Sequence, residues 1–181
     1  DWNAVWQLYR PLVERVATAL GRRLGEVDPP HRAAYARSAA RYAGRVARMD
    51  AANGRLIATV PPAERKLVTN HDAFGYLAAR YGIRIVGSVF PALSSAAQPS
   101  ARDVASLIDR IRAEHVRAVF TESSLDPTLE RQIAAEAGVR VYADLYGDTL
   151  GPAGSPGATY LGMERWNVRA MVAGFLGRPP P

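Results

Sequence analysis

The sequence predicts an α/β fold in which a four-stranded parallel sheet is flanked by helices and preceded by a long connecting helix and a second helix. From Lys66 onward, short apolar runs rich in β-branched residues alternate with helical patterns, which is typical of βα units. Before Lys66, apolar residues recur with helical spacing only. At 181 residues the chain is long enough for one core of good size.

Two helices are expected before the sheet. Residues 1 to about 25 place apolar side chains at helical spacing, but Pro11 interrupts the pattern, so this helix is expected to be kinked or to start late. A second helix is expected from about Pro30 to about Ala58, because proline suits the first turn of a helix. Asn53 and Gly54 mark a place where this helix could break.

The positive charge of the chain lies mainly in this helical region. The formal net charge is +6, and residues 1–65 contain 11 arginines and 6 acidic residues. Four arginines follow helical spacing opposite an apolar stripe, at Arg37, Arg41, Arg45 and Arg48. A solvated basic face accounts for this pattern better than a phosphate-binding surface does, so no nucleic-acid partner is expected.

Short strands and helices then alternate along the chain. Strands are expected at residues 66–69, 83–89, 117–121 and 139–143, with helices between them at about 72–81, 101–114 and 127–137. Ser100 with Asp103 has the pattern of a capping box at a helix start. Asp126, followed by Pro127 and Glu130, has the same pattern.

Glycine and proline mark the remaining boundaries. Gly82 and Gly138 stand where helices are expected to stop. A Gly/Pro-rich loop at residues 147–158 is followed by a final helix at about 161–176. The expected organisation is a helical region at 1–58, an α/β lobe at 59–177 and a tail at 178–181.

Composition and motifs exclude several classes of function. The chain has no cysteine, which removes disulfides and thiolate chemistry, and it has no apolar run long enough to cross a bilayer. Neither G-x-G-x-x-G nor G-x-x-x-x-G-K-S/T follows a strand, and Ser123 and Ser124 lack the G-x-S-x-G context of a hydrolase nucleophile. No enzyme activity is therefore expected. Without a start methionine or a leader, the chain is expected to be a processed or trimmed product.

Polar side chains lie just past the ends of three expected strands. They are His71, Glu122 and Asp148. Because ligands of an open parallel sheet bind outside the carboxyl ends of its strands, we expect these side chains to lie at one edge. Imidazole and carboxylate groups together suit Zn²⁺ or a similar divalent ion. From spacing alone, a helix cap or a surface position for His71 stays open.

Four stretches of the sequence together resemble one known family. They are KLVTNHDAFGYLAARYG at 66–82, VFTESSLDP at 119–127, LYGDTLG at 145–151 and TYLGMERWNV at 159–168. In this order and spacing they are similar to the zinc/manganese substrate-binding proteins of ABC importers, the cluster A-I or TroA-like family. The resemblance implies a protein in the periplasm, or lipid-anchored at the cell surface, that captures a divalent metal and delivers it to an importer permease.

The resemblance also implies a role for each site residue. His71, the histidine of the HDAF motif, and Asp148, the aspartate of LYGDTLG, would bind the metal directly. Glu122 would lie behind them and orient His71. Family members that prefer manganese tend to have glutamate at the position of His71, so the resemblance favours zinc over manganese.

The sequence departs from the family in its ligand set. Family members have two lobes joined by a long helix, and two further histidines come from the first lobe and from the connection before that helix. The other histidines here, His31 and His115, lie at expected helix ends and are expected to be solvated. The chain is therefore expected to be a C-terminal lobe with an incomplete site, which would bind zinc weakly without the missing N-terminal lobe.

A role without metal is the alternative hypothesis. Four aromatic residues could form an apolar surface for the missing lobe to cover, which would make the chain a docking or structural module: Trp2, Trp6, Tyr9 and Trp166. Packing of the same side chains in the chain's own core is the simpler explanation. Zinc titration of the wild-type and His71→Ala proteins separates the two hypotheses.

Overall fold

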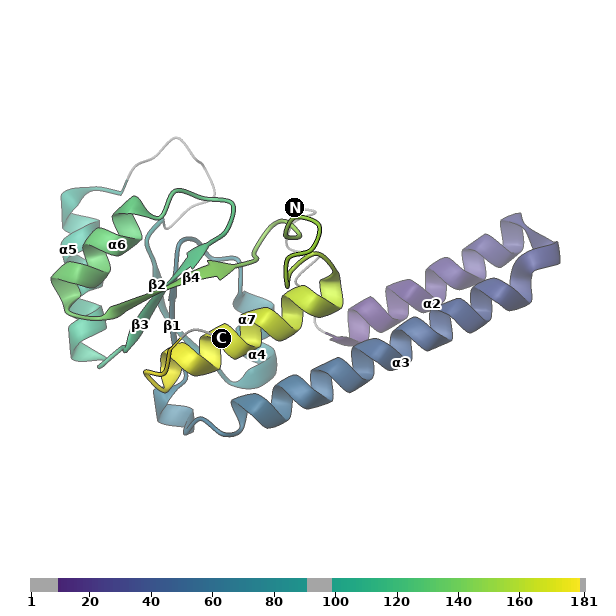
Figure 1. Ribbon diagram of the computed structural model, residues 1–181, viewed down its shortest axis with the longest axis horizontal. Helices are drawn as coiled ribbons and strands as arrows, with labels where there is room; N and C mark the ends of the chain where they lie inside the picture. The colour runs from purple at the N-terminus through teal and green to yellow at the C-terminus, as the bar shows by residue number, and fades with distance from the viewer. Residues whose placement is uncertain (1–9, 91–98, 180–181) are drawn as a thin grey trace.

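The computed structural model describes residues 10–90 and 99–179, which form an α/β body and a projecting helical hairpin (Figure 1). In chain order the elements are α2 (Arg10–Val27), η1 (Pro29–His31), α3 (Arg32–Ile57), η2 (Pro62–Glu64), β1 (Lys66–Thr69), α4 (Gly75–Tyr81), β2 (Arg84–Ser88), α5 (Ala101–Ala113), β3 (Ala118–Glu122), α6 (Thr128–Ala137), β4 (Arg140–Leu145) and α7 (Tyr160–Phe175). The predicted parallel α/β fold is confirmed. No helix within the described ranges is long and apolar enough to cross a bilayer.

The strands lie side by side in the order β2, β1, β3, β4 (Figure 1). The sequence predicts one four-stranded sheet, whereas the hydrogen bonds form two parallel pairs, β1 with β2 and β3 with β4. β1 contacts β3 between the pairs, and the four strands together are called the sheet below. Each pair has a register shift, one between Leu67 and Val68 and one between Phe120 and Glu122. Such a shift changes the direction of the side chains that follow it. Both shifts lie close to residues of the predicted site.

Alternating side chains of the strands fill two hydrophobic cores, one on each face of the sheet. Leu67 and Phe120 belong to the core under α4 and α7, whereas their neighbours Val68 and Val119 belong to the core under α5 and α6. This is the two-residue period of strands that are buried on both faces. β3 is buried along its whole length, so it is the central element of the body.

α2 and α3 pack against each other as a hairpin that extends away from the sheet (Figure 1). Pro11 lies in the first turn of α2, where no helical hydrogen bond is lost. The break considered near Asn53 does not occur, because α3 continues to Ile57. The buried Asn53 side chain instead donates to the backbone oxygen of Glu164 on α7 at 3.2 Å. The part of the first predicted helix at residues 1–9 lies outside the described residues.

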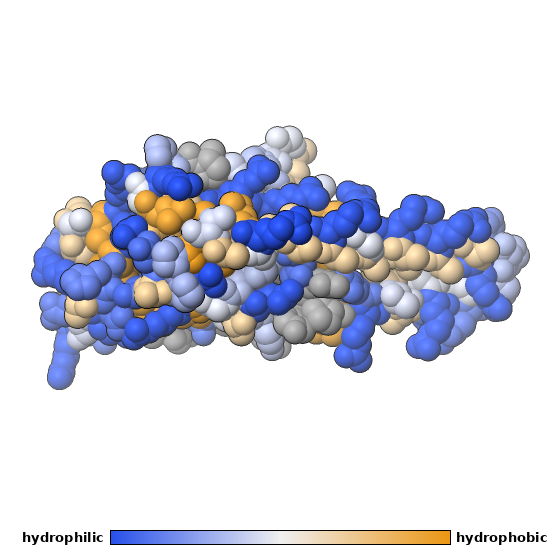
Figure 2. Space-filling view, turned by 90° about the horizontal axis from the view of Figure 1, so that it is seen from below, coloured by the Kyte–Doolittle hydropathy of each residue, from blue (hydrophilic) through white to orange (hydrophobic). Residues whose placement is uncertain are grey.

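The four arginines of the predicted basic face are all exposed on α3. On the other side of the helix, Val46 and Met49 are buried against Leu161 of α7. Figure 2 views the molecule from the α3 side, and hydrophilic residues run along the hairpin in this view. The arginine row is therefore a solvent-facing surface, as its spacing predicts. The division of the chain at residue 58 stays a prediction.

Helix ends follow the predicted signals at α4 and α5 but not at the start of α6. In the capping box of α5, Ser100 Oγ accepts from Asp103 N at 3.2 Å, and Asp103 accepts from Ser100 N at 3.1 Å. Gly82 and Gly138 directly follow α4 and α6 with φ of 63° and 74°, a left-handed conformation that glycine adopts without strain.

The capping box predicted at the start of α6 is wrong. Asp126 instead accepts from the backbone N–H and the hydroxyl of Thr128 at 2.9 and 2.5 Å, which closes a turn before the helix. Glu130 points into the protein and is fully buried. The sequence patterns also do not predict η1 and η2, because each is a single turn of three residues.

Candidate metal centre

His71 lies just past the end of β1, and the residue is 6% exposed. Its backbone oxygen accepts two hydrogen bonds, from Thr69 Oγ1 at 2.8 Å and from Ala73 N at 2.9 Å. These bonds fold the chain into a tight turn between β1 and α4. The turn holds the imidazole ring at the carboxyl edge of the sheet.

The structure brings His71, Glu122 and Asp148 together at that edge. Nδ1 of His71 lies 2.9 Å from Oε1 of Glu122, and Nε2 lies 3.2 Å from Oδ2 of Asp148. The Glu122 side chain is completely buried at the end of β3, whereas the Asp148 side chain, in the loop after β4, is 32% exposed. The ring therefore lies between one buried carboxylate and one that solvent can reach.

Glu122, the buried carboxylate, affects the pKa of the His71 ring. Its carboxylate is the main cause of a raised pKa of His71, and Asp148 acts in the same direction, while burial of the ring opposes both. Nδ1 and Oε1 are within hydrogen-bond distance, although their alignment falls short of full hydrogen-bond geometry. In the neutral ring, a proton on Nδ1 faces Glu122 and leaves the lone pair on Nε2.

Nε2 of His71 and Oδ2 of Asp148 are spaced as two ligands of one ion would be. Two atoms that each lie about 2.0 to 2.1 Å from a tetrahedral zinc ion are about 3.3 Å apart. The observed separation is 3.2 Å. Nε2 is buried and has no hydrogen-bond partner among the described residues. In the neutral ring with its proton on Nδ1, Nε2 offers a lone pair to a cation. The chemistry of the two atoms fits a divalent ion.

These two candidate ligand atoms do not amount to a closed metal site. Within residues 10–90 and 99–179, no group of three or more histidine, aspartate or glutamate side chains is placed to hold one ion. Glu122 contacts Nδ1, the ring nitrogen that does not face Asp148. That contact fits the orienting role expected for Glu122. A structural zinc site usually has four ligands, so a tight site would need further ligands.

Gly147 allows Asp148 to reach its position. A β-carbon at residue 147 would overlap with the carboxylate of Glu122. The loop after β4 can pass directly beside Glu122 because residue 147 has no side chain. The LYGDTLG stretch therefore combines a glycine needed for close approach with the aspartate that follows it.

Sequence patterns miss two buried residues behind His71. Asn70 donates from its side-chain amide to Oε1 of Glu130 on α6, and its backbone oxygen accepts from Phe90 N at 2.8 Å. Glu130 is fully buried, and its Oε2 has no hydrogen-bond partner in the described part of the chain. These bonds anchor the residue that precedes His71. The one available signal was that Glu130 shares a helical face with the buried Ile133.

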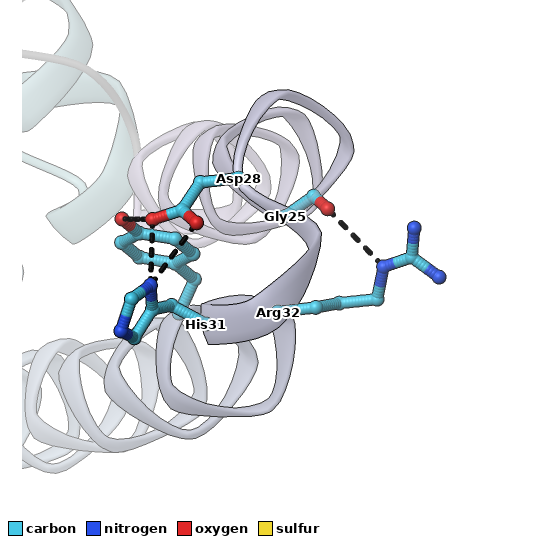
Figure 3. Close-up of polar contacts among 5 residues, drawn as sticks. Gly25, Asp28, His31 and Arg32 are labelled. Atoms are coloured by element: carbon cyan, nitrogen blue, oxygen red, sulfur yellow. Dashed lines mark hydrogen bonds and ion pairs between the residues drawn. The ribbon is translucent and has the colours of Figure 1, made fainter.

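The other two histidines lie elsewhere in the fold. His31 is at the tip of the hairpin, where its Nδ1 lies 2.9 Å from Oδ2 of Asp28 (Figure 3). The Tyr35 hydroxyl donates to the same carboxylate at 2.7 Å, and these contacts lower the pKa of Asp28. They close the turn between α2 and α3. His115 is exposed between α5 and β3 with φ of 53°.

Comparison with known sequences points to one family. Residues 6–174 match the family described as zinc-uptake complex component A, periplasmic (ZnuA). The iron-binding protein YfeA of Yersinia pestis is 32% identical over 152 residues, and the manganese-binding lipoprotein MntA of Bacillus subtilis is 33% identical over 149 residues. These matches cover 84% and 80% of this chain but only 48% of each relative. The chain thus spans about half the length of the curated relatives it matches.

Solved structures agree with this assignment. The periplasmic zinc-binding protein TroA of Treponema pallidum has a TM-score of 0.83 at 27% identity, over 95% of this chain and 63% of that one. A cadmium-bound periplasmic metal-binding protein from Candidatus Liberibacter asiaticus shares the fold with a TM-score of 0.81 at 22% identity, over 95% of this chain and 63% of that one. The fold is therefore that of the periplasmic metal-binding proteins. The chain belongs to the ZnuA family, as its motifs indicate.

Proposed function

We propose that this chain binds a divalent metal ion outside the cytoplasm, with zinc favoured over manganese, for delivery to an ABC importer. The observation that carries the proposal is the placement of His71 Nε2 and Asp148 Oδ2 3.2 Å apart at the carboxyl edge of the sheet. Glu122 holds the other side of the imidazole ring. Membership of the ZnuA family supports the same function.

The preference for zinc rests on the imidazole of His71. Imidazole nitrogen suits zinc, whereas manganese is better matched by oxygen ligands. The names of the relatives include an iron-binding, a manganese-binding and a zinc-binding protein. The relatives therefore favour no single metal, and the ligand set of this chain is the stronger argument.

The proposed site is incomplete, and the proposed partners follow from that. His71 and Asp148 supply two ligands, and we expect a further N-terminal lobe to supply two more, since closed zinc sites have about four. The match to about half of each relative supports this expectation. Relatives described as periplasmic or as lipoproteins support a place in the periplasm or at the cell surface, and an importer permease as partner. Binding and release, without catalytic turnover, is the proposed activity.

Zinc titration by calorimetry tests the proposal. The wild-type chain is expected to bind one zinc ion weakly, and His71→Ala and Asp148→Ala should each weaken this binding beyond the range that calorimetry detects. His31→Ala is the matched control, because His31 is an exposed histidine at the far tip of the hairpin. Zinc binding that survives both site substitutions, or that is absent from the wild type, would refute the proposed site.

A docking or structural role without metal is the second candidate. Four apolar side chains are exposed at helical spacing along α2 and form what we call the α2 stripe: Val16, Leu20, Leu24 and Val27. Exposed apolar stripes promote association. A wild-type chain that takes up no zinc but associates through the α2 stripe would favour this candidate.

The aromatic surface considered from the sequence is only partly visible. Trp166 is half-buried on α7. The other three aromatic residues of that surface, at positions 2, 6 and 9, lie outside the described residues. The proposed docking role therefore depends on the α2 stripe.

A further inference from the structure

Asn167 on α7 makes a two-point contact with the chain just after β4. The residue is 1% exposed. Its side-chain oxygen accepts from Tyr146 N at 2.9 Å, and its side-chain nitrogen donates to Tyr146 O at 2.8 Å. A carboxamide that pairs with both backbone groups of one residue fixes the position and the direction of the chain at that residue. Asn167 thus makes, with the residue that follows β4, the two hydrogen bonds that the backbone of a neighbouring strand would make.

The segment held by Asn167 leads directly to Asp148. Tyr146 is 6% exposed, and its ring lies directly against Gly151 and Gly157 of the following loop. Gly147 then passes beside the Glu122 carboxylate. The next residue is Asp148, whose Oδ2 lies 3.2 Å from Nε2 of His71. Only Gly147 therefore separates the residue that Asn167 contacts from the residue that carries the proposed ligand atom.

We propose that Asn167 is a positioning residue for Asp148, which sets the distance between the two proposed ligand side chains without touching the ion. This inference rests on the proposed metal site. It gives a role to a polar residue of the TYLGMERWNV stretch. Residues that orient metal ligands in this indirect way typically change metal affinity by about 10- to 100-fold when they are replaced.

A purely structural role for Asn167 makes a different prediction. Replacing the amide leaves the N–H and C=O of Tyr146 unpaired in the interior, so either role predicts a loss of stability. Only the positioning role predicts that the Asn167 substitution lowers zinc affinity by displacing the Asp148 side chain. The effect of Asn167→Leu on affinity should then disappear once Asp148 is absent.

The experiment is a double-mutant cycle on the whole chain, with zinc binding followed through the NMR signals of the His71 ring. Asn167→Leu is expected to weaken zinc binding by about 10-fold in the wild-type background and by less than about 2-fold in the Asp148→Ala background. Asn53→Leu is the matched control, because Asn53 is also a buried asparagine, and it donates to the backbone of α7 away from the site. It should leave zinc affinity unchanged. Equal weakening in both backgrounds would overturn the proposal.

The ring nitrogen shifts of His71 in the metal-free chain separate this proposal from the proposed function. Asp148→Ala should move these shifts, and Asn167→Leu should move them in the same direction, whether or not the wild type binds zinc. Unchanged shifts in Asn167→Leu would overturn the positioning role. If Asn167→Leu does not fold, Asn167→Asp serves instead, since it still accepts from Tyr146 N but no longer donates to Tyr146 O. The same shift is expected, and its absence counts against the proposal.

Discussion

The imidazole of His71 contacts two carboxylates, and the buried one has the greater influence on its protonation. Glu122 is the main cause of the raised pKa of His71, while burial of the ring acts against it. Glu122→Gln removes the charge and keeps the shape. We therefore expect a lower His71 pKa in the Glu122→Gln protein, measured by NMR titration of the metal-free chain. An unchanged pKa would contradict the role given to Glu122.

Zinc affinity should respond to the same substitution. Because a proton and the ion compete for Nε2, the wild-type affinity should fall as the pH falls through the raised pKa of His71. In the Glu122→Gln protein this fall should begin at lower pH. Above that range the variant should bind about 10-fold more weakly, since the ring is less firmly oriented. Calorimetry at several pH values measures both effects.

A second buried carboxyl, that of Glu164 on α7, should make stability depend on pH. Burial, and then the nearby Asp50, raise the pKa of Glu164 from 4.5 to about 7. The folded chain therefore holds this proton more tightly than the unfolded chain, and this contribution to stability is lost as the pH rises from about 4.5 to about 7. Glu164→Gln should raise the free energy of unfolding by on the order of 2 kcal/mol at pH 8 and leave it nearly unchanged at pH 4. Urea denaturation at the two pH values tests this, and an equal gain at both would contradict it.

At the scale of the elements, the strands could be predicted because short buried runs with β-branched residues are a local signal. β1 has the predicted bounds, 66–69. The two register shifts could not be predicted, since nothing local marks where a partner strand carries an extra residue. In a parallel sheet the carboxyl ends of β1, β3 and β4 lie at one edge, so the closeness of His71, Glu122 and Asp148 was predictable. The distances between their side-chain atoms were not.

The residues behind the candidate site escaped prediction because their partners are distant in sequence. Glu130 has the local pattern of a helix cap, and its actual partner, Asn70, lies 60 residues earlier. Asn167 similarly contacts a residue 21 positions away. Capping patterns are read over three or four residues, so they cannot detect such pairs.

Gly147 provides a test of how closely the loop after β4 must approach Glu122. In Gly147→Ala the new methyl group would occupy the space of the Glu122 carboxylate, so either that carboxylate or the loop must move. We expect a changed His71 pKa by NMR and at least about 10-fold weaker zinc binding by calorimetry. Gly44→Ala on α3 is the control, because its methyl group would make only an ordinary contact. The control should bind zinc normally and gain up to about 1 kcal/mol of stability.

At the scale of the whole molecule, the α2 stripe should govern association. Its four side chains are between 40% and 76% exposed, which is unusual for so many large apolar residues on one helical face. The chain is expected to associate at high concentration, and Leu20→Glu with Leu24→Glu should reduce this. Sedimentation velocity over a range of concentrations measures the effect. Concentration-independent sedimentation of the wild type would contradict the prediction.

The single helix α3 joins the hairpin to the body. Its 26 residues correspond to a length of about 39 Å at 1.5 Å per residue. One end lies at the hairpin tip, and the other is anchored in the core by Ile57. Rotational diffusion of the chain is therefore anisotropic. The N–H vectors of α3 run close to the long axis of the molecule (Figure 1), and we therefore expect their ¹⁵N relaxation to report its slow end-over-end tumbling.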